Sequence, residues 1–230
     1  MENIILFDSE ERDHLLPLTF TRPICELRVG ILTIREKWER KIGGKVSYIT
    51  QDYLSEKYDI TISEKNFIIN GSVLPSDQLC MLIQQMGNNE ALLSNGRLIA
   101  ARIDRKQFLR VMESDDIDEL DAFDLQDTPF QKIDNLWDIY RLNGEAMQDD
   151  FRLLTKGRKS QPISNTNNVL GEENIFLEPG AKVEFATLNA TTGPIYLDQN
   201  AEIMEGAMVR GGLALGRHSV VKMGAKILQP

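Results

Sequence analysis

Cysteine is scarce in this chain of 230 residues, long apolar runs are missing, and basic residues are outnumbered by acidic ones. The two cysteines, Cys25 and Cys80, lie far apart and match no metal-ligand spacing, so we expect both to be reduced and buried. No apolar run approaches the length that spans a bilayer. The N-terminal MENIILFDSEER lacks the basic region and cleavage site of a signal peptide. These absences predict a soluble, cytoplasmic protein with no membrane partner.

The balance of charge excludes a further class of partner. The formal net charge is −9 at pH 7, from 26 basic and 35 acidic residues. A surface that binds nucleic acid needs a concentrated basic face, so we expect no nucleic-acid partner. Hydrophobic residues make up 42% of the chain, which is enough for a buried core in one large domain or two modest ones.

Up to residue 164, short apolar runs alternate with helical patterns. We expect strands at 3–7, 45–50 and 66–71, helices at 27–44, 75–87 and 135–157, and a hairpin at 91–103. Ser76 or Asp77 is the expected N-cap of the second helix, and Asn95-Gly96 is the expected hairpin turn. This alternation predicts an α/β domain with a mostly parallel sheet over residues 1–164.

A run of acidic residues follows the expected hairpin. Its members are Glu113, Asp115, Asp116, Asp118, Glu119, Asp121, Asp124 and Asp127. The run is interpreted either as a metal site or as the solvated surface of a linker or helix. The second interpretation is the simpler one, because a run of like charges usually faces water.

From residue 165 to residue 230 the sequence has a period of six. An aliphatic residue recurs at Leu197, Ile203, Val209, Leu215, Val221 and Ile227. The residue four positions after each of the first five is mostly small: Ala201, Ala207, Leu213, Ser219 and Ala225. A β-helix explains this period, since each flat face takes one inward aliphatic residue. Gly180, Gly206, Gly212 and Gly224 fall at or near the expected turns, where a positive φ is often needed.

The repeat still runs at Lys226-Ile227-Leu228, two residues before the last one, Pro230. A solenoid needs a terminal cap that covers its last coil, and this sequence offers none. We therefore expect the chain to be a truncated form of a longer protein.

Three blocks resemble a known family: ILFD with LLPLTFTRPICELRVGILTIREKW, FIINGSVLP, and EIMEGAMVRGGLALGRHSVVKMGAKI. They resemble the sugar nucleotidyltransferases with a hexapeptide-repeat tail, in particular a divergent branch of the bifunctional N-acetylglucosamine-1-phosphate uridyltransferases and glucosamine-1-phosphate acetyltransferases. The resemblance implies a Rossmann-like nucleotidyltransferase domain followed by the first coils of a left-handed parallel β-helix. It also implies a homotrimer at full length and a role in cell-envelope sugar metabolism.

The same resemblance implies an activity. A nucleoside triphosphate, UTP or dTTP, would react with N-acetylglucosamine 1-phosphate or glucose 1-phosphate to give a nucleotide sugar and pyrophosphate. Mg2+ would assist, and acetyl-CoA would be a second cofactor only if a longer protein is bifunctional. Two other functions stay open: an acyltransferase with a degenerate N-terminal binding domain, and a scaffold without catalysis.

The family's phosphate loop has the form G-x-G-T-R-x-x-P-L-T and closes on Pro-Lys. When Pro17-Leu18-Thr19 is aligned with it, Glu10 and Arg12 occupy the glycine positions and His14 the arginine position. Pro23-Ile24 then stands at Pro-Lys. The resemblance implies nucleotide contacts at His14, Pro17, Leu18 and Thr19.

The missing positive charge of this loop has candidate replacements nearby. Arg12 and Arg22 are the candidate catalytic residues, and Arg28 is a candidate nucleotide contact, because guanidinium groups suit phosphate geometry. The alternative is that these arginines pair on the surface with Glu10, Glu11 or Glu26. His14 is, alternatively, only a histidine at a strand end.

The family usually places a magnesium-binding Asp directly after a Gly at the end of a central strand. Gly71 matches the Gly, but Ser72 stands at the Asp position and would bind magnesium far less firmly. Asn70, Gly71 and Ser72 are candidate contacts to a sugar or phosphate. The metal ligands are therefore unknown, and Asp77 is a weak candidate whose simpler role is a helix N-cap.

Acetyltransferases of this group use a histidine as general base. Only His218, between Leu215 and Val221, falls in the repeat region. Its simpler interpretation is an exposed histidine that faces solvent.

Overall fold

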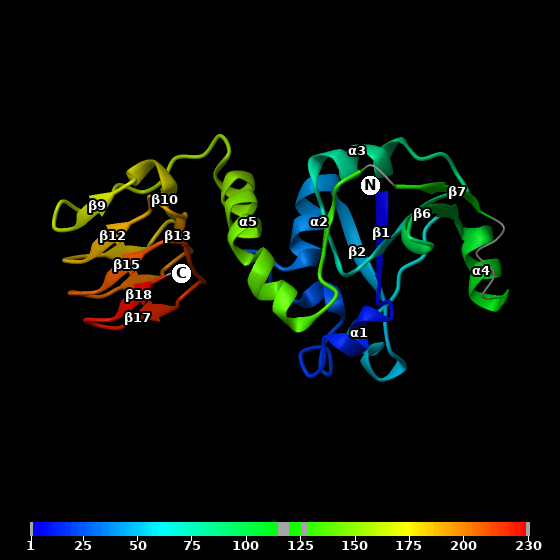
Figure 1. Cartoon of the computed structure of the whole chain (residues 1–230), viewed down its shortest axis with the longest axis horizontal. Coiled ribbons are helices and arrows are strands. Elements are labelled where there is room, and N and C mark those ends of the chain that lie inside the picture. Colours follow the sequence, from blue (N-terminus) through cyan, green and yellow to red (C-terminus); the bar gives the residue numbers. More distant parts are fainter. Residues whose placement is uncertain (1, 115–119, 126–127, 229–230) are drawn as a thin grey trace. The chain divides into compact units, whose positions relative to one another are not determined.

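A computed structural model describes residues 2–114, 120–125 and 128–228 of the chain. These residues form two compact units, one of residues 1–28 and 32–140, the other of residues 29–31 and 141–230 (Figure 1). Within the described part of the chain, no helix is both long and apolar enough to cross a membrane.

A six-stranded sheet forms the centre of the first unit. In spatial order its strands are β2 (Gly44–Ile49), β1 (Glu2–Phe7), β3 (Lys65–Asn70), β6 (Arg97–Asp104), β5 (Glu90–Ser94) and β7 (Asp121–Asp124). β1 is parallel to both β2 and β3, whereas β6 is antiparallel to β3 and β5. β7 pairs with β5 in parallel. The α/β class is therefore confirmed, with a mixed sheet in which β6 alone is antiparallel to its neighbours.

The core of this unit lies around β1, where Ile4, Ile5 and Leu6 are at most 1% exposed. A strand that is apolar on both faces belongs in the middle of a sheet covered on both sides. The other elements are α1 (Glu11–His14), η1 (Ile24–Glu26), α2 (Ile34–Ile42), η2 (Asp52–Leu54), β4 (Val73–Leu74), α3 (Asp77–Gln85), α4 (Arg105–Ser114) and β8 (Gln131–Lys132). Buried Trp38 of α2 donates from Nε1 to the Val73 carbonyl at 3.0 Å, which joins α2 to β4.

The expected helix over 27–44 begins later, at Ile34 of α2. Thr33 caps it: its hydroxyl accepts from the Glu36 amide, and the Glu36 carboxylate accepts from the Thr33 amide. This capping box fixes the start of α2. Before it, Gly30 has a φ of +84°, which a helix does not allow. The predicted start at residue 27 was thus wrong, because the capping box of Thr33 and Glu36 sets the first turn of the helix.

Two local predictions are confirmed and one is wrong. The hairpin of β5 and β6 turns at Asn95 and Gly96, which both have a positive φ (50° and 73°), as an Asn-Gly turn requires. Ser76 is the N-cap of α3 and accepts from the Leu79 amide at 3.1 Å. Asp77 is therefore not the cap but the first residue of the helix.

The second unit contains most of α5 (Leu136–Thr155), which confirms the helix expected at 135–157. The short segment 29–31 belongs to this unit: the Gly30 amide donates to Asn143 Oδ1 at 2.9 Å, and the Ile31 amide to Asp150 Oδ2 at 2.8 Å. A Cβ at Gly30 would lie 2.7 Å from the Ala146 carbonyl carbon. Glycine at this position therefore allows the backbone to approach α5.

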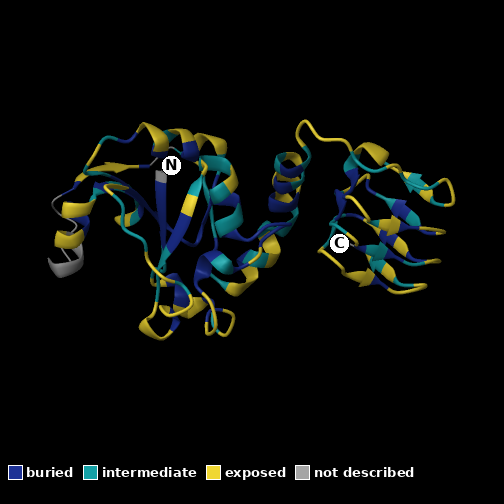
Figure 2. Cartoon of the chain, turned by 180° about the vertical axis from the view of Figure 1, so that it is seen from behind, coloured by how far each residue is buried: buried dark blue, intermediate teal, exposed yellow. Residues whose placement is uncertain are grey.

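The rest of the second unit consists of parallel coils that form three sheets, as the period of six predicts. The sheets are β10–β13–β16, β11–β14–β17 and β18–β15–β12–β9. Their strands are β9 (Asn168–Leu170), β10 (Ile175–Leu177), β11 (Lys182–Val183), β12 (Thr187–Asn189), β13 (Ile195–Leu197), β14 (Glu202–Ile203), β15 (Met208–Arg210), β16 (Leu213–Leu215), β17 (Val220–Val221) and β18 (Lys226–Leu228), with η3 (Glu172–Asn174) before β10. In Figure 2 buried and exposed positions alternate along these coils.

The predicted inward positions are confirmed. Leu197, Ile203 and Val209 are at most 2% exposed and form one core cluster with Val221. Leu215 and Ile227 are partly buried and pack against this cluster. At the corners, Gly180, Gly206 and Gly224 have positive φ as expected. Gly212 lies directly after the residue that has the positive φ at this corner, Gly211 (93°).

Candidate functional site

Polar side chains gather where β1 and β3 end. Phe7 of β1 is paired with Asn70 of β3 in parallel, so Asp8-Ser9 and Gly71-Ser72 leave the sheet at the same edge. The Gly71 amide donates to the Phe7 carbonyl at 2.8 Å, and a Cβ on Gly71 would lie 3.0 Å from that oxygen. A side chain at this position would therefore crowd the Phe7 carbonyl, and glycine avoids that contact. In open α/β sheets ligands bind at this carboxyl edge.

Asn70 joins the two strand ends. Its Oδ1 accepts from the Ser72 amide at 3.0 Å, the Ser72 hydroxyl at 2.7 Å and the Ser9 hydroxyl at 3.3 Å. Its Nδ2 donates to the Leu98 carbonyl at 3.4 Å. Asn70 and Ser72 are both buried, Ser72 completely. The three predicted residues Asn70, Gly71 and Ser72 thus lie together, with their polar atoms already bonded to one another.

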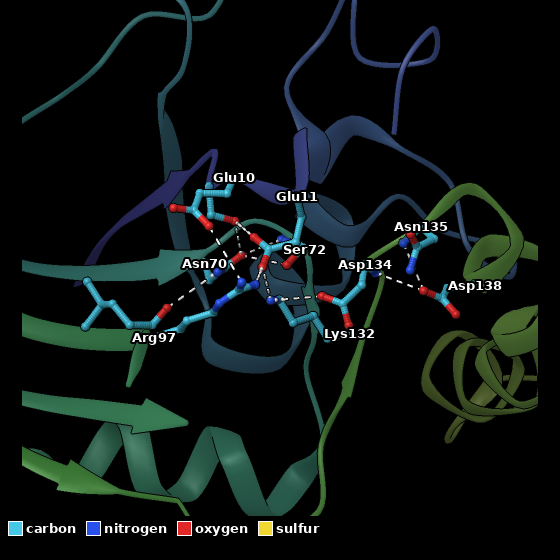
Figure 3. Close-up of polar contacts among 11 residues, drawn as sticks. Glu10, Glu11, Asn70, Ser72, Arg97, Lys132, Asp134, Asn135 and Asp138 are labelled. Atoms are coloured by element: carbon cyan, nitrogen blue, oxygen red, sulfur yellow. Dashed lines mark hydrogen bonds and ion pairs between the residues drawn. The ribbon is translucent and has the colours of Figure 1, made fainter. Parts of the chain in front are cut away.

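A buried carboxylate lies beside this cluster (Figure 3). Glu11 of α1 is 1% exposed, and its Oε1 accepts from Lys132 Nζ and, at 2.7 Å, from Arg97 NH1. Its Oε2 accepts from the Ser9 hydroxyl. Burial alone would raise the pKa of the Glu11 carboxyl, but the hydrogen bonds from Lys132 and Ser9 outweigh it and lower the pKa to about 2. Glu11 is therefore ionised and holds two cations side by side.

The short strand β8, which pairs with β4 in a separate two-stranded sheet, brings Lys132 to this place. Lys132 is paired with Val73 of β4, and the Ile133 amide donates to the Ser72 carbonyl at 3.0 Å. Lys132 Nζ also lies 3.0 Å from Asp134 Oδ1. The next segment is fixed by Asp138, whose Oδ2 accepts from the amides of Asp134 (3.1 Å) and Asn135 (2.9 Å) (Figure 3). Lys132 is therefore held on a well-anchored strand.

Arg12 is buried and bonds inward. Its guanidinium donates to Asp8 Oδ2 and to the Tyr53 hydroxyl, each at 2.8 Å, and to the carbonyls of Thr19 and Arg22. Asp8 in turn accepts from the Ile24 amide at 2.7 Å and from the Thr50 hydroxyl at 2.6 Å.

The Thr19 hydroxyl closes this ring by donating to the Arg12 carbonyl at 2.9 Å. The buried pair of Arg12 and Asp8 therefore ties the loop of residues 15–24 to the end of β1.

The other candidate nucleotide contacts between residues 14 and 28 face outward. His14, Pro17, Leu18, Arg22 and Arg28 are all exposed. Arg28 NH1 lies 3.7 Å from Glu36 Oε2. The structure thus separates two groups: Arg12 and Thr19 inside the loop, and the five outward residues on its surface.

The alternative prediction, that Arg12 and Arg28 pair on the surface with Glu10, Glu11 or Glu26, is wrong. Arg12 pairs with Asp8 and Arg28 with Glu36, while Glu26 pairs with Arg35, as the ion pairs show. Glu11, expected on the surface, is the buried centre of the Lys132 and Arg97 contacts.

Asp77, the weak metal candidate, is exposed and forms an ion pair with Lys41. Among the described residues no group of three or more acidic, histidine or cysteine side chains could hold a metal. Of the acidic run, Asp115, Asp116, Asp118, Glu119 and Asp127 lie outside the described residues, as does the side chain of Glu113. Asp121 and Asp124 are exposed on β7, which fits the interpretation of a solvated surface.

The donors at the carboxyl edge do not fit a magnesium ion. Magnesium prefers carboxylate oxygens, phosphate oxygens and water in octahedral geometry. Ser72 is neutral and completely buried, and its hydroxyl donates to Asn70. Both oxygens of Glu11 are bonded to donors of the protein. The buried polar groups here thus satisfy one another.

Three other side chains were singled out in the sequence, namely His218, Cys25 and Cys80. His218 is exposed, which agrees with the simpler interpretation of a histidine that faces solvent. It lies at a corner of the β-helix and has a φ of 58°. Cys25 and Cys80 are both free and buried, as expected. Burial raises the pKa of both thiols, that of Cys80 to about 11. Neither thiol is therefore ionised near neutral pH.

Sequence reasoning missed Ser9, Arg97 and Lys132, and it misplaced Glu11. Arg97 could have been found from the sequence, because it directly follows the predicted hairpin turn and the turn fixes the end of the sheet at which Arg97 lies. No local pattern pointed to Lys132, because it lies 121 positions from Glu11 in the sequence.

Comparison with known protein families gives a match. The model of a family described as sugar nucleotidyl transferase matches residues 4–159, which is more than half of the chain. The matched range includes the polar side chains at the ends of β1 and β3, which we name the carboxyl-edge cluster: Ser9, Glu11, Asn70, Ser72, Arg97 and Lys132. No curated protein matches the chain.

Proposed function

Since this chain belongs to the sugar nucleotidyl transferase family, we propose that it transfers the nucleotidyl group of UTP or dTTP to a sugar 1-phosphate. The acceptor in this proposal is N-acetylglucosamine 1-phosphate or glucose 1-phosphate. A phosphate oxygen of the acceptor attacks the α-phosphorus of the triphosphate in line and forms a new P–O bond. The bond from that phosphorus to the bridging oxygen of the leaving group breaks, and pyrophosphate departs with the electron pair.

The observation that carries the proposal is the pair of cations at the carboxyl edge. Arg97 and Lys132 converge on one oxygen of Glu11, beside the ends of two parallel strands. In phosphoryl and nucleotidyl transfer the protein mainly positions the reactants and stabilises charge, and it does little covalent chemistry. Two cations held side by side suit that work, because guanidinium and ammonium groups donate to phosphate oxygens.

The outward loop residues complete the proposed site. Arg22 is exposed on the loop that Arg12 ties to the end of β1, and we assign it a contact to the triphosphate. His14, Pro17, Leu18 and Arg28 are assigned to the nucleotide in the same way. Arg12 and Thr19 hold the shape of the loop through their mutual bonds. Asn70 and Gly71 are assigned to the sugar phosphate.

Separation of products by anion-exchange chromatography tests this function. Each of the two triphosphates is incubated with each of the two sugar 1-phosphates, and nucleotide-sugar formation is followed with time. We expect one pair to give product, and Arg97→Met and Lys132→Met each to lower its rate at least tenfold, since a charged hydrogen bond is worth about 1.5–3 kcal/mol. Lys65→Met is the matched control, because Lys65 is exposed at the opposite end of β3. Absence of product from all four pairs, with folded protein, contradicts the proposal.

A further inference from the structure

Carboxylates at the carboxyl edge each lie close to a cation of the protein, and Asp8 is paired with Arg12 at 2.8 Å. Glu11 is bonded to Lys132 and Arg97. Asp134 lies 3.0 Å from Lys132, and Glu10 lies 3.6 Å from Arg97 NH2. A divalent cation placed here would compete with these pairs for each oxygen. At the position directly after Gly71, the hydroxyl of Ser72 brings no charge and donates to Asn70.

The two cations retain donors for an anion. Lys132 has three N–H donors, of which Glu11 and Asp134 take two. Arg97 has five, and its side chain is 55% exposed with one hydrogen bond to Glu11. Arginine binds phosphate oxygens in a bidentate manner, and lysine binds them as a point charge. The chemistry left open at this edge is therefore that of a polyphosphate.

We infer that Lys132 and Arg97 bind the triphosphate directly, without a magnesium ion held by the protein, and that buried Glu11 is the counter-anion that limits their positive charge. The inference rests on the proposed function for the identity of the ligand, a nucleoside triphosphate. It differs from the magnesium requirement that the sequence resemblance implies.

Glu11 gives the inference a distinctive consequence. It is 1% exposed and bonded at both oxygens, so it is a fixed negative charge next to the phosphate site. Glu11→Gln keeps the size of the side chain and removes that charge. If Glu11 were only a structural support, its loss would weaken nucleotide binding or leave it unchanged. As a counter-anion, its loss strengthens binding.

Isothermal titration calorimetry with UTP and with dTTP tests this, in buffer with EDTA and in buffer with magnesium chloride. For the wild-type protein we expect dissociation constants that agree within threefold between the two buffers. In EDTA, Lys132→Met and Arg97→Met each weaken binding at least tenfold, and Glu11→Gln strengthens it at least threefold. Lys65→Met, an exposed lysine at the far end of β3, leaves it unchanged.

A second variant covers failure to fold. Lys132→Met leaves the buried Glu11 carboxylate with a single cation, which could destabilise the fold. The double variant Glu11→Gln/Lys132→Met removes one charge of each sign and so keeps the net charge of the cluster, and it is titrated as well. Its folding is checked by circular dichroism, and we expect it to bind at least tenfold more weakly than Glu11→Gln alone.

Three results overturn the inference. If binding appears only with magnesium, or if Glu11→Gln weakens binding or leaves it unchanged, the inference fails while the proposed function stands. If folded wild-type protein binds neither nucleotide in either buffer, both fail together.

Discussion

At the scale of single residues, the most consequential group is the buried carboxylate of Glu11. Its pKa of about 2 lies below the ordinary value of 4.5, so the ionised form is stabilised in the folded protein. A group with a lowered folded pKa contributes stability above its unfolded pKa and loses it as the pH falls towards the folded value. For Glu11 that window runs from about 4.5 down to about 2.

Glu11→Gln is therefore expected to show a pH-dependent loss of stability. The difference in free energy of unfolding between wild type and variant stays constant from pH 8 to 6 and then shrinks as the pH falls below about 4.5, by up to about 3 kcal/mol. Urea titrations at stepped pH measure it. Glu56→Gln serves as the control, because the Glu56 side chain is exposed. A difference that grows towards low pH would refute this account of Glu11.

Glycines of the β-helix corners give a second prediction at this scale. Gly180 has a φ of +83°, and a Cβ there would collide with the side chain of Asn200. A left-handed conformation costs a residue other than glycine roughly 1–2 kcal/mol, so Gly180→Ala should lower the thermal midpoint measured by far-UV circular dichroism. Gly216→Ala is the matched control: Gly216 has no positive φ, and the nearest atom to its Cβ would be Ser219 Oγ at 3.7 Å. Equal midpoints for the two variants would count against the corner geometry.

At the scale of elements, α2 depends on its capping box. The Thr33 hydroxyl accepts from the Glu36 amide at 3.2 Å, and Glu36 Oε2 accepts from the Thr33 amide at 2.7 Å. Thr33→Ala is expected to lower the free energy of unfolding by about 1 kcal/mol, the usual value for a lost N-cap. Urea unfolding measures the change, with Thr21→Ala on the exposed loop as the control. An unchanged stability in Thr33→Ala would show that packing alone fixes the start of α2.

Elements also show how far sequence reasoning reached. The β-helix was predictable because its coils repeat: Ile203 and Val221 are partners in adjacent coils and occupy equivalent positions of the period. The hairpin was predictable because Asn95-Gly96 carries its conformation locally. The start of α2 was not found, although Thr33 and Glu36 were a readable signal. The period also explains His218, since it takes the corner position that Asn200 has in the preceding coil, and both have a positive φ.

The site was far less predictable than the fold, because its contacts join distant segments. Glu11 meets Arg97 across 86 positions and Lys132 across 121. Asn70, Gly71 and Ser72 were found because a strand end with glycine is a local pattern. Arg12 is buried because its guanidinium bonds to Asp8, to Tyr53 and to two backbone carbonyls. These partners come from separate segments, so no local sequence pattern predicts them.

At the scale of the whole molecule, both tryptophans, Trp38 and Trp137, lie in the first unit. Tryptophan fluorescence therefore reports the unfolding of the unit that carries the carboxyl-edge cluster. A ligand that binds only the folded state adds about 2.7 kcal/mol at a concentration of 100 times Kd. We expect UTP or dTTP to raise the urea midpoint of this signal, and we expect Lys132→Met to abolish the shift. A shift of equal size in Lys132→Met would locate nucleotide binding elsewhere.

The reverse reaction tests the central claim most directly. Radiolabelled pyrophosphate is mixed with the protein and either UDP-N-acetylglucosamine or dTDP-glucose, and the nucleotides are separated. The account predicts that label appears in UTP or dTTP with wild-type protein and with Lys65→Met, and that it appears at least tenfold more slowly with Lys132→Met. If all label stays in pyrophosphate while the protein is folded, the chain does not catalyse nucleotidyl transfer between these substrates, and the account is contradicted.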